Sequence, residues 1–150
     1  MTILSAQSIR KRGIFTPFHE RTRQNGLTFG LSACGYDVRI GQAVYVPAGG
    51  FVLASTLEHF DIPPDLAALV KDKSTWARRG ICVQNTVAEP GWRGYLTLEI
   101  TNHSSTSLFI DRGDPIAQII LELLDEPTEA PYAGKYQDQA NRPVEAIIDR

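Results

Sequence analysis

Short runs of alternating hydrophobic and polar residues make up most of the chain. Residues 36–40 alternate with a period of two, and residues 43–46 continue that pattern. Residues 50–56 resume it after a turn that contains Pro47 and Gly49. A period of two places successive side chains on opposite faces of an extended backbone. These three segments are therefore predicted to be β-strands.

The second half of the chain shows more segments of the same kind, separated by Gly, Pro, Asp and Asn. Further strands are predicted over residues 67–70, 81–87, 95–101, 107–110 and 116–124. In residues 95–101 the hydrophobic side chains share one face, and Glu99 lies on the other. Many short strands with regular turn signals are typical of an all-β barrel or a jelly-roll-like sandwich.

The two ends of the chain differ from this pattern. Residues 5–12 are predicted to form a short helix, which Ser5 can cap and Gly13 ends. Residues 127–143 have no hydrophobic period and contain Pro, Gly, Gln, Lys and Tyr. This composition is compatible with a disordered end or with an arm that becomes ordered over a ligand.

Composition places the chain among ordinary globular proteins. It has 150 residues, of which 43% are hydrophobic and 21% charged, so a single domain is expected. The net charge is −2, and no general positive field would attract nucleic acid. A site for an anionic ligand must therefore be built locally.

The sequence also suggests a compartment. Cys34 and Cys82 form no disulfide framework and are expected to be buried, reduced thiols. The N-terminus lacks the charged and apolar regions of a signal peptide, and no stretch approaches the roughly 20 apolar residues of a membrane helix. We expect a soluble, cytoplasmic protein with no membrane partner.

Several familiar catalytic sites are excluded by the residues present. Zinc-dependent nucleobase deaminases need His-x-Glu and Pro-Cys-x-x-Cys. None of His19, His59 and His103 is followed by x-Glu, and the two cysteines are far apart. Walker-type, dinucleotide-binding and Gly-x-Ser-x-Gly motifs are also absent from the sequence.

Two polar segments could bind parts of a phosphorylated ligand. Residues 73–80 combine two hydroxyls and three cations, which would make a compact phosphate cradle or, alternatively, a solvated charged loop. Residues 89–94 form a Pro-Gly turn beside Trp92. There Glu89 could accept a hydrogen bond from a sugar hydroxyl, although an ordinary β-turn would look the same.

Glu99 is the candidate for acid and base chemistry. A carboxylate in the middle of a strand is costly unless it faces water or has a partner. An exposed strand face would explain it equally well. Partial burial would instead raise its pKa towards neutrality, which suits proton transfer.

Taken together and in this order, the segments resemble the dCTP deaminase family, the metal-free branch of the dUTPase-like superfamily. The matching motifs are Lys73-Ser74-Thr75-x-Ala77-Arg78, Glu89-Pro90-Gly91-Trp92-x-Gly94, Thr97-Leu98-Glu99 and Tyr132-x-Gly-Lys135-Tyr136-x-x-Gln139. Further matching pieces are Ile3-Leu4-Ser5 at the opening helix, the strand at residues 35–41 and residues 115–118.

The resemblance implies a dUTPase-like distorted β-barrel or jelly-roll with a short N-terminal helix. Residues 1–126 would form the β domain, and residues 127–150 would be an arm that closes over the nucleotide. The family assembles as homotrimers, so a homotrimer with sites completed between neighbours is expected. Unprotected strand edges are also better covered in an assembly.

The resemblance also assigns roles to individual residues in a reaction that converts dCTP to dUTP and ammonia. Glu99 would activate the water that attacks C4 and then pass the proton to the leaving ammonia, while Ser74 and Arg78 hold the water and the base edge. Mg²⁺ would bridge the phosphates without a protein metal site, and no zinc is expected. Substrate-binding roles are implied for Lys73, Thr75, Trp76, Ala77, Asn85, Glu89, Thr97, Leu98, Tyr132, Lys135 and Gln139.

Two departures from the family pattern bear on the product. Glu89 stands where the family usually has Asp, and Lys73 stands where arginine is frequent, which removes bidentate phosphate geometry. A bifunctional deaminase and dUTPase, or a dUTPase that produces dUMP and diphosphate, is the first alternative. The Ile-Asp-x-x-Tyr turn and phenylalanine-containing arm typical of dUTPases are missing. A non-catalytic nucleotide-binding β protein is the second alternative.

Overall fold

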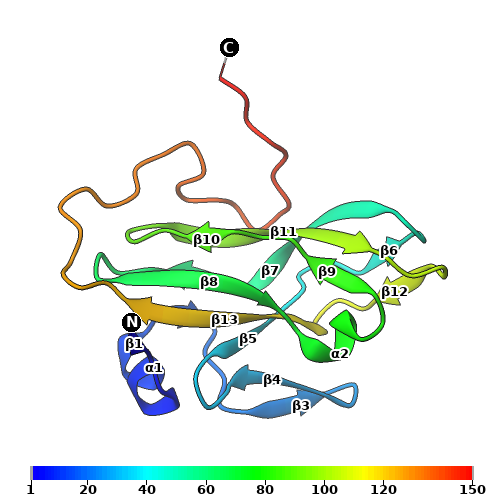
Figure 1. Ribbon diagram of the computed structural model, residues 1–150, viewed down its shortest axis with the longest axis horizontal. Coiled ribbons are helices and arrows are strands. Elements are labelled where there is room, and N and C mark those ends of the chain that lie inside the picture. The colour runs from blue at the N-terminus through cyan, green and yellow to red at the C-terminus, as the bar shows by residue number, and fades with distance from the viewer. Residues whose placement is uncertain (1, 150) are drawn as a thin grey trace.

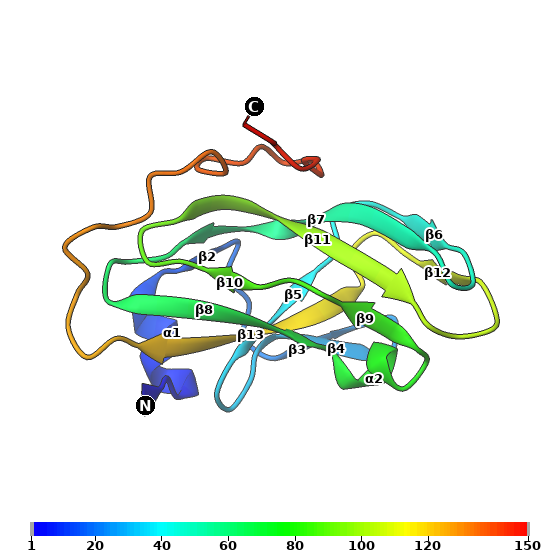
Figure 2. The same cartoon turned by 45° about the horizontal axis from the view of Figure 1, so that its top comes forward.

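Two curled antiparallel sheets and a two-stranded ribbon make up the computed structural model, which describes residues 2–149 (Figures 1 and 2). The strands of the larger sheet are β1 Thr2–Ile3, β3 Thr22–Gln24, β4 Leu27–Leu31, β5 Tyr36–Arg39, β8 Leu66–Asp72, β10 Val87–Ala88 and β13 Pro115–Leu123. They run in the order β10-β8-β13-β5-β4-β3, with β1 also paired to β13.

The second sheet carries the longest strands. Its members are β2 Phe15–Thr16, β7 Phe51–Asp61, β9 Ile81–Val83 and β11 Arg93–Asn102, in the order β2-β7-β11-β9. The ribbon pairs β6 Val44–Val46 with β12 Leu108–Ile110. Two short helices, α1 Ala6–Arg12 and α2 Ser74–Ala77, complete the regular structure.

The hydrophobic core lies between the two sheets. Tyr36 and Val38 enter it from β5, and Phe60, Leu98 and Ile100 enter it from β7 and β11; all five are fully buried. Burying one such side chain stabilises a fold by about 1.5–3 kcal/mol. The core therefore fixes the side of β11 that Leu98 and Ile100 occupy, and it leaves Glu99 on the opposite side.

The predicted helix is confirmed, with one difference at its start. Gly13 ends α1 in the left-handed conformation, with φ 64. At the N-terminus, the Ser5 carbonyl accepts from the amides of Ser8 and Ile9. The Ser5 hydroxyl does not cap the helix backbone, because it donates to Ser8 Oγ instead.

The strand predicted over residues 81–87 is wrong in one respect. It is split into β9, which pairs with β11, and β10, which pairs with β8 in the other sheet. The segment between them crosses from one sheet to the other, so no single ladder can contain it. This crossing lies beside the middle of β11 and shapes the candidate site.

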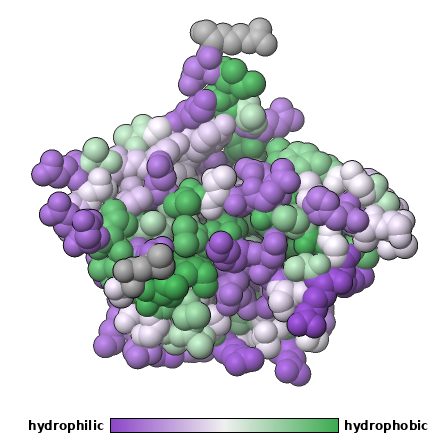
Figure 3. Space-filling model, viewed as in Figure 1, coloured by the Kyte–Doolittle hydropathy of each residue, from purple (hydrophilic) through white to green (hydrophobic). Residues whose placement is uncertain are grey.

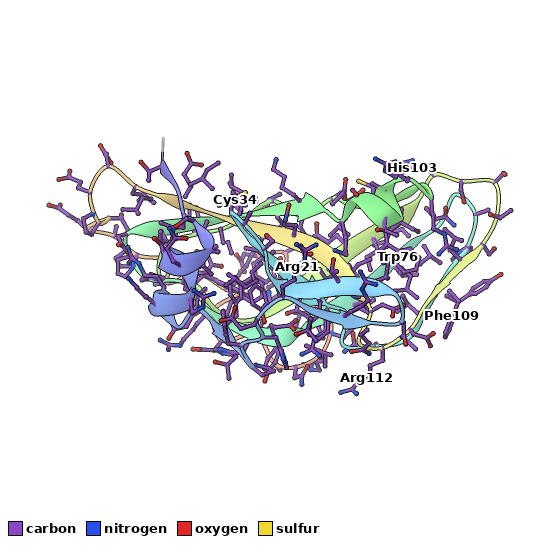
Figure 4. All side chains as sticks on the ribbon, turned by 90° about the horizontal axis from the view of Figure 1, so that it is seen from below. Arg21, Cys34, Trp76, His103, Phe109 and Arg112 are labelled. Carbon is purple, nitrogen blue, oxygen red and sulfur yellow. The ribbon has the colours of Figure 1, made fainter. Side chains whose placement is uncertain are left out.

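Cys34 also differs from its prediction, because it is exposed, whereas Cys82 is half-buried. Cys34 lies in the connection between β4 and β5 and is labelled in Figure 4. Both thiols are free. In residues 2–149 no helix has the length and apolar character needed to cross a membrane.

Candidate active site

A pocket of about 780 Å³ lies against the middle of β11, under the C-terminal segment. The C-terminal segment from residue 127 onwards, the arm, leaves β13 and returns over β11 (Figures 1 and 2). The pocket is lined by residues of β7, β8, β10 and β11, by the crossing between β9 and β10, and by the arm. The polar lining residues are Asn85, Thr86, Glu89, Thr97, Glu99, Tyr132, Tyr136, Gln139 and Glu145.

Glu99 contributes its carboxylate from the centre of β11. Its backbone is opposite Leu53 of β7, and its side chain is half-buried in the pocket lining. Burial raises the pKa of this carboxyl above its usual value. Within the described chain the Glu99 carboxylate has no hydrogen-bond or ion-pair partner, so it is free to exchange a proton with a ligand or water.

Glu58 is the other carboxyl whose pKa is raised by burial, and it has a different environment. It is fully buried and accepts hydrogen bonds from the backbone N–H and the Nε of Arg39, both at 2.8 Å. The guanidinium of Arg39 also stacks over Phe29 at 4.5 Å. Glu58 is thus held by a structural partner outside the pocket, which leaves Glu99 as the candidate acid and base.

Leu96 lies in the pocket, although strict alternation predicts that it faces away from Glu99. A bulge between Tyr95 and Thr97 interrupts the pairing of β11 with β7. The Leu96 amide there donates to Thr56 Oγ1 at 3.0 Å instead of to a strand partner. The bulge therefore adds an apolar wall to the polar side of the strand.

The arm adds backbone pairing to β11 next to the pocket. The Tyr95 amide donates to the Gln139 carbonyl, and the Asp138 amide donates to the Arg93 carbonyl, each at 3.0 Å. A Cβ on Gly94, whose φ is +139, would lie 2.6 Å from Gln139 N. Close approach of the arm therefore requires glycine at position 94.

Two side chains fix the arm further. The indole N–H of Trp92 donates to the Tyr136 carbonyl at 2.7 Å. The Thr97 hydroxyl donates to Gln139 Oε1 and accepts from the Val144 amide, both at 3.0 Å. In this structure these contacts hold the arm over the pocket.

Lys135 lies on the arm beside the pocket but is not part of its lining. Its Nζ donates to the Ile147 carbonyl and lies 3.3 Å from the Asp149 carboxylate. Lys135 is therefore held by the end of the arm itself, and it would have to leave these two partners to contact a phosphate.

The residues of α2 and the turn around it lie away from this pocket. Lys73 forms an ion pair with Asp37 of β5 at 2.7 Å. Trp76, labelled in Figure 4, is a core residue whose indole donates to the Pro115 carbonyl at 2.9 Å. Ser74, Thr75, Ala77 and Arg78 are exposed, and none of them lines the pocket.

The structure thus brings together six of the predicted site residues: Asn85, Glu89, Thr97, Glu99, Tyr132 and Gln139. Leu98 is fully buried on the other face of β11, so only its main chain can face a ligand. Trp92 and Tyr136 line the pocket although no site role was predicted for them. The aromatic residue in the Pro-Gly-Trp turn was the available signal for Trp92.

Comparisons with known proteins give the family. A model of the dCTP deaminase-like family matches residues 36–124. The chain belongs to this family. It is 34% identical to the dCTP deaminase of Acidobacterium capsulatum, over 93% of this chain and 96% of that protein. It is 37% identical to the dCTP deaminase of Campylobacter fetus subsp. fetus, over 95% of this chain and 94% of the relative.

Solved structures give the same fold. The 2′-deoxycytidine 5′-triphosphate deaminase from Agrobacterium tumefaciens aligns with a TM-score of 0.66 and 17% identity, over 81% of this chain and 47% of that chain. The EIAV dUTPase aligns with a TM-score of 0.61 and 16% identity, over 81% of this chain and 97% of that one. The predicted dUTPase-like β fold is confirmed.

Proposed function

We propose that the protein is a hydrolase that converts dCTP and water to dUTP and ammonia. The observation that supports this most directly is Glu99. It is a half-buried carboxylate without a partner in the described chain, it has a raised pKa, and it stands on the Thr-Leu-Glu strand of a dCTP deaminase-like chain. The chain's relatives in Acidobacterium capsulatum and Campylobacter fetus are named for this activity.

Glu99 serves both halves of the reaction. Its carboxylate takes a proton from water as the water oxygen bonds to C4 of the cytosine ring. Attack at C4 moves the electrons of the C4–N3 double bond onto N3. The carboxylic acid then gives a proton to the amino nitrogen, the bond from C4 to that nitrogen breaks, and ammonia leaves. The remaining hydroxyl proton passes to N3 as the C4 carbonyl forms. A raised pKa suits a group that must accept and return a proton near neutral pH, and such catalysis typically contributes about 10²- to 10⁴-fold in rate.

The other pocket residues would position the nucleotide. Thr97 and the main chain of Leu98 would lie beside the pyrimidine, and Glu89 would face the deoxyribose. Tyr132, Lys135 and Gln139 on the arm would close over the phosphates, together with Thr75 and Ala77 of the α2 segment. Lys73, paired with Asp37, and Trp76, buried in the core, hold that segment in place. Mg²⁺ would enter bound to the triphosphate and neutralise part of its charge.

A second copy of the chain would supply the α2 segment. Ser74 and Arg78 are exposed and lie outside the Glu99 pocket of their own chain, so the predicted site is incomplete in one copy. Exposed apolar residues, including Phe109, which Figure 4 labels, and its strand partner Tyr45, offer surface for assembly. Figure 3 shows green, hydrophobic residues at several places on the surface. We infer a homotrimer whose sites lie between neighbours.

Mixing two inactive variants tests this assembly. In trimers that combine Glu99→Gln and Arg78→Ala chains at random, about a quarter of the sites would have an intact Glu99 from one chain and an intact Arg78 from its neighbour. Co-expressed variants should therefore regain activity. No recovery, or a monomeric mass by light scattering, would contradict shared sites.

The proposed product is dUTP, not dUMP. Glu89 lines the pocket and is exposed, and its side chain is one methylene longer than the family's usual aspartate. This difference argues against water activation at the phosphates. Release of dUMP and diphosphate would instead support the bifunctional alternative or, with dUTP as the only substrate, the dUTPase alternative.

The Glu99→Gln variant tests the mechanism. We expect turnover of dCTP to fall by at least about 10²-fold while the protein stays folded, because glutamine cannot exchange the proton. Glu122→Gln is the matched control, since Glu122 is also a half-buried strand residue, near the end of β13, but lies outside the pocket. Full turnover by Glu99→Gln would refute the assigned role. Nucleotide binding with no turnover in the unmodified protein would support the non-catalytic alternative.

A further inference from the structure

The edge of β11 beside Glu99 has a gap in its strand pairing. β9 pairs with β11 only from Ile100 to Asn102, and β10 pairs with β8 instead. The Gln84 amide makes the last main-chain contact, to the Glu99 carbonyl at 3.0 Å. Beyond that contact, the Glu99 amide and the Thr97 carbonyl have no neighbouring strand on this edge.

Asn85 fills this gap with its side chain. Its Nδ2 donates to the Thr97 carbonyl at 2.7 Å, and its Oδ1 accepts from the Glu99 amide at 3.0 Å. One carboxamide thus replaces two ladder hydrogen bonds and spans the strand on either side of Leu98. Each such bond contributes about 0.5–1.5 kcal/mol net, and an unpaired buried group would cost more.

The Glu99 carboxylate depends on this backbone for its position. Its own oxygens have no partner in residues 2–149, and the pocket leaves room around them. Catalytic carboxylates are commonly oriented by a hydrogen-bonded neighbour. Here the orientation must come from the main chain that carries the side chain.

We propose that Asn85 is a positioning residue for Glu99, because its carboxamide holds the β11 main chain at the Thr97 carbonyl and at the Glu99 amide itself. This inference rests on the proposed deaminase function. It assigns Asn85 a role that acts through Glu99, in place of the direct substrate contact expected from the sequence. A misplacement of about 1 Å in a reacting group can cost about 10²-fold in rate.

Kinetics of two variants separate these roles. Asn85→Leu keeps the approximate size without the hydrogen bonds, and Asn85→Ala removes the side chain. For both we expect kcat for dCTP to fall about 10- to 100-fold, with KM within about 3-fold of the original value. A rise in KM with unchanged kcat would instead show a direct substrate contact and overturn the proposal.

Gln84→Ala is the control, because Gln84 is the exposed neighbour on the same segment and its side chain makes no hydrogen bond in the described structure. Its kcat and KM should remain unchanged. A loss of kcat as large as that of the Asn85 variants would assign the effect to the segment as a whole and not to the carboxamide.

Hydrogen exchange tests the contact independently of activity. In Asn85→Ala the Glu99 amide should exchange about 10-fold faster, while the Ile100 amide, which faces β7, should keep its protection. Unchanged exchange at Glu99 would overturn the proposal even in an active enzyme. If exchange at Glu99 is faster but the unmodified protein does not deaminate dCTP, the proposed function has failed. The Asn85 contact would then exist without a positioning role in this reaction.

Discussion

Replacing Trp92 by Phe should loosen the arm over the pocket. The indole N–H of Trp92 donates to the Tyr136 carbonyl at 2.7 Å, and phenylalanine has no donor. The net loss from one such bond is about 0.5–1.5 kcal/mol, which corresponds to an about 2- to 12-fold larger fraction of open arm. Because opening is a local equilibrium, proteolysis of the open form should rise by the same factor.

Limited trypsin digestion measures this fraction, since Lys135 lies on the arm and is followed by Tyr136. The initial rate of cleavage after Lys135 should rise about 2- to 12-fold in Trp92→Phe. Trp76→Phe is the matched control: Trp76 is equally buried, and its indole donates to the Pro115 carbonyl at 2.9 Å, away from the arm.

Both substitutions leave a space in the core and should lower the free energy of unfolding by similar amounts. Only Trp92→Phe should accelerate cleavage after Lys135 at low denaturant. Equal cleavage rates in the two variants, or no change in Trp92→Phe, would refute the conclusion that Trp92 holds the arm.

Two further substitutions probe the arm and the acid. Gly94→Ala should detach the arm at Gln139, because the new Cβ would lie 2.6 Å from Gln139 N. Trypsin cleavage after Lys135 should then rise, with little change in the melting temperature of the β domain. Unchanged cleavage would contradict this prediction. Glu99→Gln should not lower the melting temperature at about pH 7.5. Burial raises the pKa of Glu99, so the folded state binds the carboxyl proton more tightly than the unfolded state does. The stability gained from this proton is fully present below the ordinary carboxyl pKa and is lost as the pH rises through the raised pKa. Glutamine is neutral at every pH and avoids this loss of stability. Any gain in melting temperature of Glu99→Gln over the unmodified protein should therefore shrink as the pH falls towards about pH 4. A clearly lower melting temperature of the variant at neutral pH would contradict this reasoning.

Local patterns predicted the parts of the fold that depend on local physics. The period of two in residues 95–101 correctly placed Leu98 and Ile100 in the core and Glu99 opposite them. The helix ended at Gly13 as predicted, because the left-handed conformation there favours glycine.

Features that depend on contacts between distant segments were not predictable in this way. The split between β9 and β10 results from the crossing between two sheets, which an apolar run does not reveal. The order of the arm results from its hydrogen bonds to β11, and its own sequence has no period that would show them. The resemblance implied a substrate-binding role for Asn85, but only the structure shows its two bonds to the Thr97 and Glu99 main chain.

The separation of α2 from the Glu99 pocket has the same origin. The motif around Ser74 and Arg78 and the motif around Glu99 belong to one predicted site, yet the fold places them apart within one chain. Sequence order contains no information about which copy of the chain supplies each motif. The family resemblance already implied that sites are shared between neighbours, and this separation within one chain supports that proposal.

The central claim is tested most directly by incubating the purified protein with dCTP and Mg²⁺ and separating the nucleotides by ion-exchange chromatography. We predict that dUTP accumulates together with an equal amount of ammonia, and that neither is formed by Glu99→Gln. Unchanged dCTP, with dUTP converted to dUMP and diphosphate in a parallel incubation, would contradict the deaminase assignment.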